Sequence, residues 1–355
     1  MKCKIEDIVE VTMGQSPKSQ YYNTEENGVP FLQGNRTFGF KRPTFDTYTT
    51  LVTKSAKAGD VIMSVRAPVG DLNITPVDMC LGRGVCSLRM KNGNQEFLYY
   101  MMKYYMPQLL NKESGTVFGS VNRKDINGLE VDIPEDTDKQ KKIERYLTMI
   151  DDRIELNTEI NKNLEQQAQA IYQQMFITNR NPNWENGLLS DLVAVRYGKD
   201  HKKLKDGIYP VYGSGGIMRY VEKPLYTGES VLIPRKGTLN NVMYVNGAFW
   251  SVDTMFYTEM LRSNVAKFVY HFVKSKDLAS MNAGSAVPSM TTNILNAMQL
   301  YIPDNEILST FEEIVSPMYS QMQENEKQSK KLADLRDTLL PRLMSGELDI
   351  SEIEF

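Results

Sequence analysis

The stretch IERYLTMIDDRIELNTEINKNLEQQAQAIYQQM, residues 143–175, decides the fold class. Its apolar and small residues recur in alternating steps of four and three over more than four heptads. This spacing is typical of a coiled coil and predicts a long helix that packs along its length against another. The positions are Ile143, Leu147, Ile150, Ile154, Asn157, Asn161, Leu164, Ala168, Ile171 and Met175.

The same pattern returns in phase 168 residues later, at Phe311, Val315, Met318, Met322, Asn325, Ser329, Leu332, Arg336, Leu339 and Leu343. Arg336 interrupts it, and the neighbouring Leu335 is the alternative core residue. A single helix of this kind would be an ordinary core helix, but two in phase at matching places predict pairing. We expect the pairing to rest on Ile143, Ile150, Asn157, Leu164, Ile171, Met318, Asn325, Leu332 and Leu339.

The polar positions predict that the two helices are antiparallel. Asn157 and Asn325 lie near the middles of their helices, so an antiparallel crossing makes them neighbours, and paired amides can fix the register. Ser316 and Pro317 could restart the second helix, and Pro341 should kink or end its last turns. Gly346 is a plausible stop signal.

The regions outside the helices repeat one another, at an offset that falls along the chain. The matches are residues 5–9 with Gly14 against 189–193 with Gly198 (offset 184), 28–31 against 208–211 (offset 180), 59–62 with Arg66 against 228–231 with Arg235 (offset 169), and Gly115, Ser120 and Pro134 against Gly284, Ser289 and Pro303 (offset 169). The second copy is therefore shorter by about fifteen residues, lost from loop-like stretches that often carry function. A plain structural duplication is the alternative.

Each copy mixes strands and helices. Residues 60–65 and 230–233 are short β-branched runs, residues 129–134 and 298–303 alternate like half-buried strands, and residues 97–110 and 265–281 have helical character. We expect an α+β (mixed α/β) fold with two pseudo-repeated globular domains separated by two long antiparallel coiled-coil helices. The predicted bounds are 1–138 and 179–305 for the domains, 139–178 and 306–347 for the helices, and 348–355 for a tail.

Composition excludes several classes of protein. Cys3, Cys80 and Cys86 are odd in number without a CxxC pair, which indicates a reduced compartment, and two histidines would give zinc an unusual ligand set. No secretory leader and no membrane-length apolar run is evident. The net charge is −3, although residues 179–305 carry 14 Lys and Arg against 10 Asp and Glu. Any nucleic-acid surface must come from local clusters of Arg and Lys.

The length of the helices suggests a spacer. About 38 residues of helix extend roughly 57 Å, whereas DNA repeats its major groove about every 34–36 Å. If the two predicted globular domains each read DNA and are held a fixed distance apart, they would contact grooves on one face of a duplex. The DNA between them would then not be read.

Two short stretches of the sequence are similar to those of a known protein family. Residues 132–134 and 138–143 (DIP, then DKQKKI) and residues 335–348 (LRDTLLPRLMSGEL) resemble the helix entry and the C-terminal helix of the specificity (S) subunits of type I restriction–modification systems. The resemblance covers nearly the whole chain, and the glycine–serine segments 114–120 and 284–289 also fit it.

The resemblance implies a protein without a catalytic site of its own, whose two target-recognition domains each read half of a split double-stranded DNA site. It implies that the helices set the spacing and dock methylation subunits, two of them by expectation, and through these the restriction and motor subunits. S-adenosylmethionine, ATP and Mg²⁺ would then belong to those partners, and the complex to the cytoplasm of a prokaryotic cell.

The candidates for DNA contact are loop side chains whose chemistry suits bases or phosphates. Arg can bond guanine O6 and N7 together, and Asn or Gln can bond adenine in the same bidentate way, while Lys suits phosphates. They are Gln33, Asn35, Arg36, Lys41, Arg42, Arg66, Arg123, Arg196, Lys199, Lys202, Arg219, Arg235, Lys236 and Asn240. Arg66 and Arg235 occupy matching positions after a strand, although an ion pair or a strand-end cap would also explain them.

Two other functions stay open at this point. A stand-alone DNA methyltransferase needs a glycine-rich cofactor loop and an Asn/Asp-Pro-Pro-aromatic motif, but residues 181–184 (NPNW) lack the second proline and residues 213–216 (GSGG) lack the dinucleotide spacing. A coiled-coil adaptor that binds no nucleic acid would suit the acidic C-terminal helix.

Overall fold

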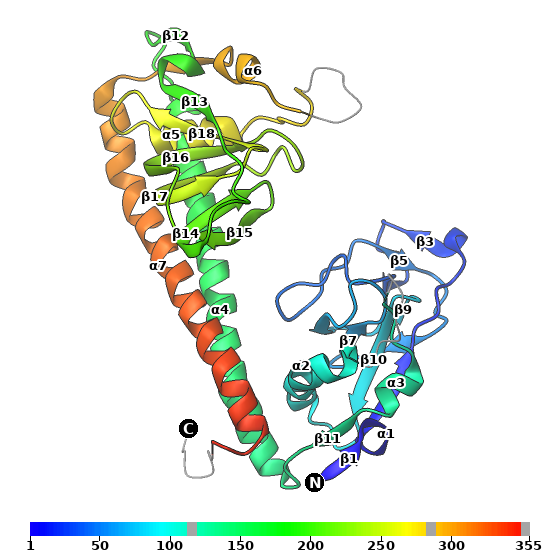
Figure 1. Ribbon diagram of the computed structural model, residues 1–355. Helices are drawn as coiled ribbons and strands as arrows, with labels where there is room; N and C mark the ends of the chain where they lie inside the picture. The colour runs from blue at the N-terminus through cyan, green and yellow to red at the C-terminus, as the bar shows by residue number, and fades with distance from the viewer. Residues whose placement is uncertain (112–118, 282–288, 349–355) are drawn as a thin grey trace. The chain divides into compact units, whose positions relative to one another are not determined.

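The computed structural model describes residues 1–111, 119–281 and 289–348. Contacts divide the chain into a first unit, Met1–Glu159 with Asn325–Phe355, and a second unit, Ile160–Glu324. The helices α4 (Thr137–Tyr172), extended by the π-helical turn η2 (Gln173–Thr178), and α7 (Asn305–Met344) contribute to both units (Figure 1). The glycine–serine segments 114–120 and 284–289 lie almost wholly outside the described residues.

The first unit packs small sheets against a helix. Its elements are β1 (Lys2–Lys4), α1 (Ile5–Ile8), β2 (Val9–Met13), η1 (Ser19–Tyr21), β3 (Tyr22–Asn23), β4 (Val29–Leu32), β5 (Tyr48–Thr49), β6 (Ser55–Ala56), β7 (Val61–Ser64), β8 (Leu72–Ile74), β9 (Met79–Leu81), β10 (Val85–Met90), α2 (Gln95–Leu110), α3 (Arg123–Asn127) and β11 (Glu130–Asp132). The sheet orders are β1-β11, β2-β10-β7-β8 and β3-β5-β4-β9-β6. The buried residues of α2 form one core with β2, β7 and β10, and Ile143 and Leu147 of α4 complete it.

The second unit repeats this plan. Its elements are β12 (Glu185–Leu188), η3 (Leu189–Asp191), β13 (Val193–Tyr197), β14 (Asp206–Gly213), β15 (Gly216–Val221), β16 (Tyr226–Pro234), β17 (Met243–Ser251), β18 (Met255–Met260), α5 (Ala266–Lys274), α6 (Thr292–Asn296) and β19 (Gln299–Ile302). The pair β12-β19 mirrors β1-β11, and the six-stranded order β13-β18-β16-β17-β14-β15 contains the counterpart of β2-β10-β7-β8. The internal repeat is confirmed, although the predicted helix 265–281 ends at Lys274.

Backbone pairing corrects the repeat by one residue. Gly14 donates to the carbonyl of Val85 and Gly198 to that of Met255, both at 3.0 Å, so Val85 and Met255 are equivalent. Val85 pairs with Ser64 and Met255 pairs with Pro234, which makes the local offset 170 rather than 169. The match of Arg66 with Arg235 is therefore wrong, and Arg66 corresponds to Lys236. A slip of one residue would also place the strand's side chains on opposite faces.

Gly14 and Gly198 stand where two backbones touch. A Cβ at Gly14 would lie 2.0 Å from the carbonyl oxygen of Gly82, and a Cβ at Gly198 would lie 2.0 Å from that of Val252. Real Cβ atoms do not approach so closely, so each glycine allows its strand to pack against the neighbouring turn. These contacts explain why both copies keep a glycine at this position.

Gly198→Ala is expected to lower the free energy of unfolding of the second unit by about 1–3 kcal/mol, because the turn at Val252 must move away. The midpoint of urea unfolding, followed by tryptophan fluorescence, measures this. Gly215→Ala is the matched control, since a Cβ there meets nothing within 4 Å and should leave the midpoint unchanged. Equal midpoints for the two variants would contradict the close-packing account.

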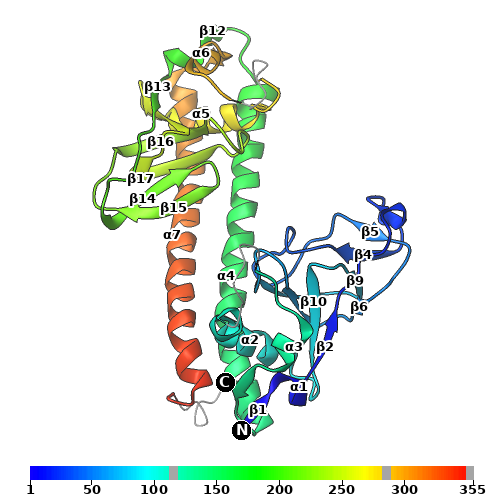
Figure 2. The same cartoon turned by 45° about the vertical axis from the view of Figure 1, so that its right-hand side comes forward.

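The long helices are antiparallel within each unit (Figures 1 and 2). In the first unit Asp151 pairs with Arg336 and Asn157 bonds Ser329, so a step forward on α4 is a step back on α7. In the second unit Asn161 donates to the carbonyl of Met322 at 3.0 Å. The pairing residues predicted on both helices are buried or half-buried.

Asn157 and Asn325 are neighbours, as predicted, and both are buried. The amide of Asn157 donates to the backbone carbonyl of Asn325 at 3.4 Å, and to the side chains of Gln328 and Ser329 at 2.9 and 3.1 Å. The bond thus joins an amide to backbone and to other side chains, where the prediction had two paired amides.

The second helix differs from expectation in two details and ends as expected. Arg336 keeps the seam position with 7% exposure while Leu335 is 47% exposed, so the alternative core residue is wrong. The helix runs unbroken from Asn305 through Pro317, so it does not restart there. It ends at Met344, three residues after Pro341, and Gly346 adopts the left-handed φ of +76° that stops a helix. The domain bounds themselves stay a prediction.

No helix in the described parts of the chain combines the length and the apolar character needed to cross a lipid bilayer.

Candidate nucleic-acid interface

Four segments of the first unit meet through backbone hydrogen bonds. Gly84 donates to the carbonyl of Gln33 at 3.0 Å, Val65 donates to that of Gly84 at 2.8 Å, and Val121 donates to that of Val65 at 3.1 Å. Arg66 also forms an isolated bridge with Ser120. We name residues 33–36, 65–66, 82–84 and 120–123 loop cluster 1. It holds five of the predicted residues, which are Gln33, Asn35, Arg36, Arg66 and, at the start of α3, Arg123.

Glycines allow this cluster to close. A Cβ at Gly82 would lie 2.7 Å from the Cα of Gln33, and one at Gly84 would lie 2.4 Å from its carbonyl oxygen. The turn between them exposes Arg83, whose amide donates to the Ser16 hydroxyl at 3.0 Å. Sequence reasoning missed Arg83, although the Gly-Arg-Gly triplet between two strands was the signal for a tight turn that carries a cation.

A cavity of about 230 Å³ opens beside residues 33–36 of the cluster, lined by Tyr22, Phe31, Leu32, Gln33, Gly34, Arg36, Thr37, Asp46 and Thr47. Arg36 lies 2.7 Å from Asp46, and its hydrogen bond, with that of Thr47, holds the pKa of the Asp46 carboxyl below its usual value. The Thr37 hydroxyl oxygen is buried and has no hydrogen-bond partner in the described structure. The cavity thus offers both donors and acceptors to a polar ligand.

The second unit repeats the arrangement. Val252 donates to the carbonyl of Tyr212 at 3.1 Å, Arg235 donates to that of Thr254 at 2.8 Å, and Met290 donates to that of Arg235 at 3.0 Å. We name residues 197–199, 212–214, 235–236, 252–254 and 289–290 loop cluster 2. Its predicted members are Lys199, Arg235 and Lys236. The Arg235 guanidinium stands 5.3 Å from the centre of the Tyr197 ring, which adds a cation–π contact to the alternatives of an ion pair or a strand-end cap.

The remaining candidates of the second unit divide into exposed and engaged side chains. Lys202 is exposed on the loop between β13 and β14, together with Lys203 and Lys205, which sequence reasoning missed. Arg196 pairs with Glu259 at 2.9 Å, and Arg219 with Asp206 at 2.8 Å.

Asn240 is held on both sides of its amide. It donates to Asp277 at 3.0 Å and accepts from the amide of Ala279 at 3.0 Å. These bonds make it a brace between two loops, which leaves its amide poorly placed to read a base.

The prediction that Lys41 contacts DNA is wrong. Its amine lies 2.7 Å from the Glu96 carboxylate and the side chain is 1% exposed, so it is not available to DNA. Asn35 donates to Asp71, which partly engages its amide. Arg42 is exposed and interacts electrostatically with Glu155 of α4.

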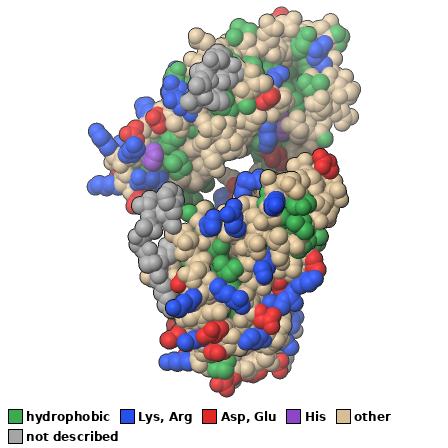
Figure 3. Space-filling view, turned by 90° about the vertical axis from the view of Figure 1, so that its right-hand side faces the viewer, with side chains coloured by type: hydrophobic (Ala, Val, Ile, Leu, Met, Phe, Trp, Pro, Cys, Tyr) green, Lys and Arg blue, Asp and Glu red, His purple; other side chains and the backbone are tan. Residues whose placement is uncertain are grey.

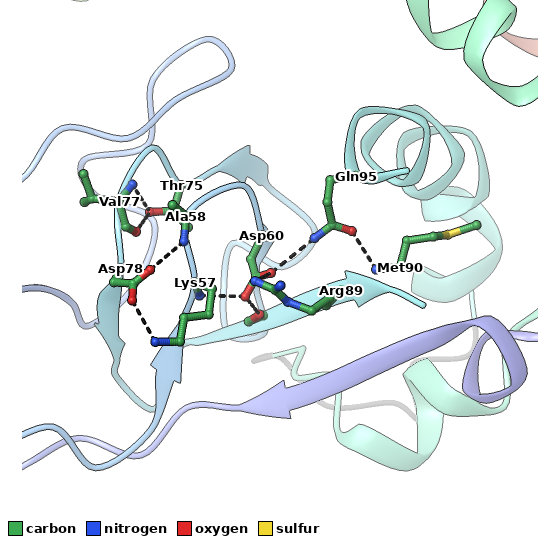
Figure 4. A network of polar contacts seen from close by, with 10 residues as sticks. Lys57, Ala58, Asp60, Thr75, Val77, Asp78, Arg89, Met90 and Gln95 are labelled. Carbon is green, nitrogen blue, oxygen red and sulfur yellow. Dashed lines mark hydrogen bonds and ion pairs between the residues drawn. The ribbon is translucent and has the colours of Figure 1, made fainter. Parts of the chain in front are cut away.

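A buried carboxylate, Asp60, holds the framework together at the start of β7, the opposite end of that strand from residues 65–66 (Figure 4). Asp60 accepts from Arg89 at 2.6 Å, from the Ser87 hydroxyl at 2.7 Å, from the Lys57 amide at 2.8 Å and from Gln95 at 3.2 Å. These partners tie β7, β10 and α2 together. With so many donors, Asp60 is a structural group.

Charge is distributed without one continuous basic field on the face shown in Figure 3, where Lys and Arg side chains are interspersed with Asp and Glu. On this face, any attraction for a polyanion would come from local clusters of Lys and Arg, as the composition indicates.

The two segments that suggested methyl transfer are turns. Asn181 accepts from the Asn183 amide at 3.0 Å, and the Trp184 indole donates to Asp304 at 3.2 Å. Gly213 pairs with Gly216 to close the β14–β15 hairpin. Both segments are accounted for by the fold.

Comparison with known proteins agrees with this architecture. The chain is 36% identical over 168 residues to the putative type I restriction enzyme MjaX specificity subunit of Methanocaldococcus jannaschii, covering 47% of this chain and 39% of that relative. It is 22% identical over 406 residues to the MjaIX specificity subunit of the same organism, covering 99% and 94%. The crystal structure of the type I restriction–modification S subunit from M. genitalium shares the fold, with a TM-score of 0.63 at 17% identity over 99% of this chain and 96% of that one.

The family model described as the type I restriction modification DNA specificity domain matches residues 1–166 and 181–333. These two regions correspond to the two halves of the repeat and include most of each long helix. The chain therefore belongs to the family of type I restriction–modification specificity subunits.

Proposed function

We propose that this specificity subunit reads a bipartite DNA site, with loop cluster 1 contacting one half and loop cluster 2 the other. The observation that carries the proposal is the duplicated ladder of backbone hydrogen bonds, which gathers cationic side chains from distant segments in each unit, together with amide side chains in the first. Reading of a base edge requires such side chains to be held on a rigid scaffold.

In loop cluster 1 the exposed guanidinium groups of Arg66 and Arg83 suit guanine, and the amide of Gln33 suits adenine. In loop cluster 2 the ring of Tyr197 orients Arg235 for base contact. The neighbouring Lys199, Lys202 and Lys236 are exposed ammonium groups suited to phosphates.

The helices would serve as spacer and docking surface in the same complex. Exposed apolar side chains stand on both, with Met149 and Leu156 on α4 and Ile314 and Leu335 on α7, each at least 43% exposed. Methylation subunits are the partners we propose for them, likewise two in number. S-adenosylmethionine, ATP and Mg²⁺ would be bound by the partner subunits, and this chain would supply recognition without catalysis.

Arg66→Ala is expected to relax one base position in the half-site read by the first unit, by about 1–3 kcal/mol of discrimination. Arg235→Ala should relax the other half-site in the same way. The measurement is the map of methylated sites produced by the chain assembled with its methylation subunits, read to the level of single positions.

Lys57→Ala is the matched control, because Lys57 is an exposed cation paired with Asp78 at the other end of β9 from the Arg83 turn. It should leave both half-sites unchanged. An unchanged map for Arg66→Ala and Arg235→Ala together would refute the assignment of the clusters. Methyl transfer by the purified chain alone would refute its non-catalytic role.

A further inference from the structure

Residues 37–44 of the first unit, which we name the recognition loop, follow directly after residues 33–36 of loop cluster 1. This loop contacts the long helices α4 and α7 as well as α2. Three consecutive residues after Gly39 each face a different helical partner. Phe40 lies under the Arg336 guanidinium of α7, with 5.7 Å between the charge centre and the ring. Lys41 reaches Glu96 of α2, and Arg42 interacts electrostatically with Glu155 of α4.

Lys41 is the centre of this contact. Its amine makes the ion pair with Glu96 and lies 3.4 Å from both the Tyr100 and Thr148 hydroxyls. It also stands 5.4 Å and 5.8 Å from the ring centres of Tyr100 and Tyr99. A lysine charge removed from water is stable only with such partners, so the position of its chain is strongly constrained.

The backbone around Lys41 is equally fixed. Its carbonyl accepts from the Ile74 amide at 2.8 Å, while Asn73 both donates to and accepts from the backbone of Gly39 at 3.0 Å. Asn73 is itself buried, which makes this brace part of the sheet that contains β8.

The loop connects Lys41 to Arg36 and Gln33, two of the residues proposed to contact DNA. Thr44 donates to the carbonyl of Thr37 at 2.9 Å and Gly39 to that of Arg42 at 3.1 Å, so residues 37–44 form a closed loop. Its far end holds Lys41, and at its near end Arg36 pairs with Asp46. A displacement of Lys41 therefore displaces Arg36 and the neighbouring Gln33.

The second unit has a buried lysine of a different kind. Lys267 pairs with Glu229 of β16 at 2.9 Å and with Glu312 of α7 at 2.5 Å, and is 5% exposed. It lies on α5, outside loop cluster 2. Both units thus use a buried lysine to dock on a long helix, but only in the first does that lysine belong to the recognition loop.

We propose that Lys41 is a positioning residue for DNA reading by the first unit. It fixes the position of loop residues 33–36 relative to α2 and α4. The inference rests on the proposed function of loop cluster 1. It predicts that the packing of this loop on the helices sets base preference in one half-site and has no effect on the other.

The test removes both charges of the pair at once, in the variant K41M/E96Q, so that no unpaired charge is left buried. Assembled with the methylation subunits, this variant should lose about tenfold in discrimination between bases of the first half-site and none in the second. The matched control K267M/E312Q should lower thermal stability without changing base preference in either half-site.

Base preference separates positioning from stability, because a merely structural lysine would lower the melting temperature and leave the ratio of methylated sites unchanged. An unchanged ratio, or an equal loss in both half-sites, would overturn the proposal. If K41M/E96Q does not assemble, Asn73→Ala, which removes the Gly39 brace without burying a charge, must relax the first half-site alone or the proposal is wrong. Arg66→Ala serves as the reference, since no effect from it would refute the function of the cluster and not the role of Lys41.

Discussion

Replacing Asp151 by alanine is expected to lower the free energy of unfolding of the first unit by about 3–5 kcal/mol. Asp151 is fully buried in α4, where it accepts from Arg336 of α7 at 2.8 Å and from the Tyr100 hydroxyl of α2 at 2.7 Å. Its removal leaves a guanidinium and a hydroxyl in the interior without their main acceptor. The midpoint of the corresponding urea transition, followed by circular dichroism, measures the loss.

The exposed partner of the same guanidinium provides the control. Asp337 lies 2.8 Å from Arg336 but its side chain is 63% exposed, so Asp337→Ala should cost less than about 1 kcal/mol. The double variant Asp151→Leu with Arg336→Leu should recover most of the stability, because apolar side chains replace a buried pair without leaving a charge. A cost for Asp337→Ala equal to that of Asp151→Ala would contradict the dominance of burial.

The long helices show how much can be predicted from the hydrophobic repeat alone. The heptad spacing at residues 143–175, repeated in phase at residues 311–343, is enough to predict both long helices. The central places of Asn157 and Asn325 are enough to predict their direction. From the sequence, Arg336 interrupts the pattern, because its partner Asp151 lies 185 residues away and no local signal marks it. A charge in an apolar seam is therefore interpretable only once the opposite helix is known.

The repeat shows a second limit. Loop lengths change between the copies, so a sequence match can slip by one residue where Gly-Asp stands against Gly-Glu, as at residues 59–60 and 228–229. Hydrogen bonding of Gly14 and Gly198 fixes the true alignment, because the ladder has a period of two and a slip would reverse the buried face.

The candidate interface was predictable by residue type but not by environment. Residue type and loop position predict Arg66, Arg235 and Gln33 as candidates, and the structure places each in a loop cluster. The same rule predicts Lys41 and Asn240. In the fold, however, Lys41 contacts Glu96 and Tyr100 and Asn240 bonds Asp277, and only the fold brings these partners near. Composition identifies side chains able to contact DNA, whereas burial decides which of them are available.

The second unit is expected to lose stability in mild acid through one residue, His271. The side chain has no exposed surface, and burial lowers its pKa from 6.5 to about 4, against the opposing effect of Glu165. Its Nδ1 lies 2.7 Å from the amide oxygen of Gln169 and its Nε2 lies 2.9 Å from the Tyr319 hydroxyl. The neutral imidazole satisfies both contacts, since Nδ1 donates to Gln169 and Nε2 accepts from Tyr319.

Because the folded pKa is below the unfolded one, the unfolded chain binds a proton first as the pH falls. The contribution of His271 to stability is therefore intact above about pH 6.5 and lost progressively toward pH 4, by about 3 kcal/mol in total. Urea unfolding of the second unit at half-unit steps between pH 7 and pH 4 measures this slope.

His271→Gln supplies the comparison, because glutamine keeps a polar side chain at the site and cannot titrate. Its stability should decline less steeply than that of the wild-type chain over the same range, since no imidazole at position 271 takes up a proton on unfolding. Identical slopes for the two proteins would mean that His271 is protonated in the folded state near its ordinary pKa. The contacts with Gln169 and Tyr319 would then have to rearrange, since an imidazolium donates from both nitrogens and cannot accept from the Tyr319 hydroxyl.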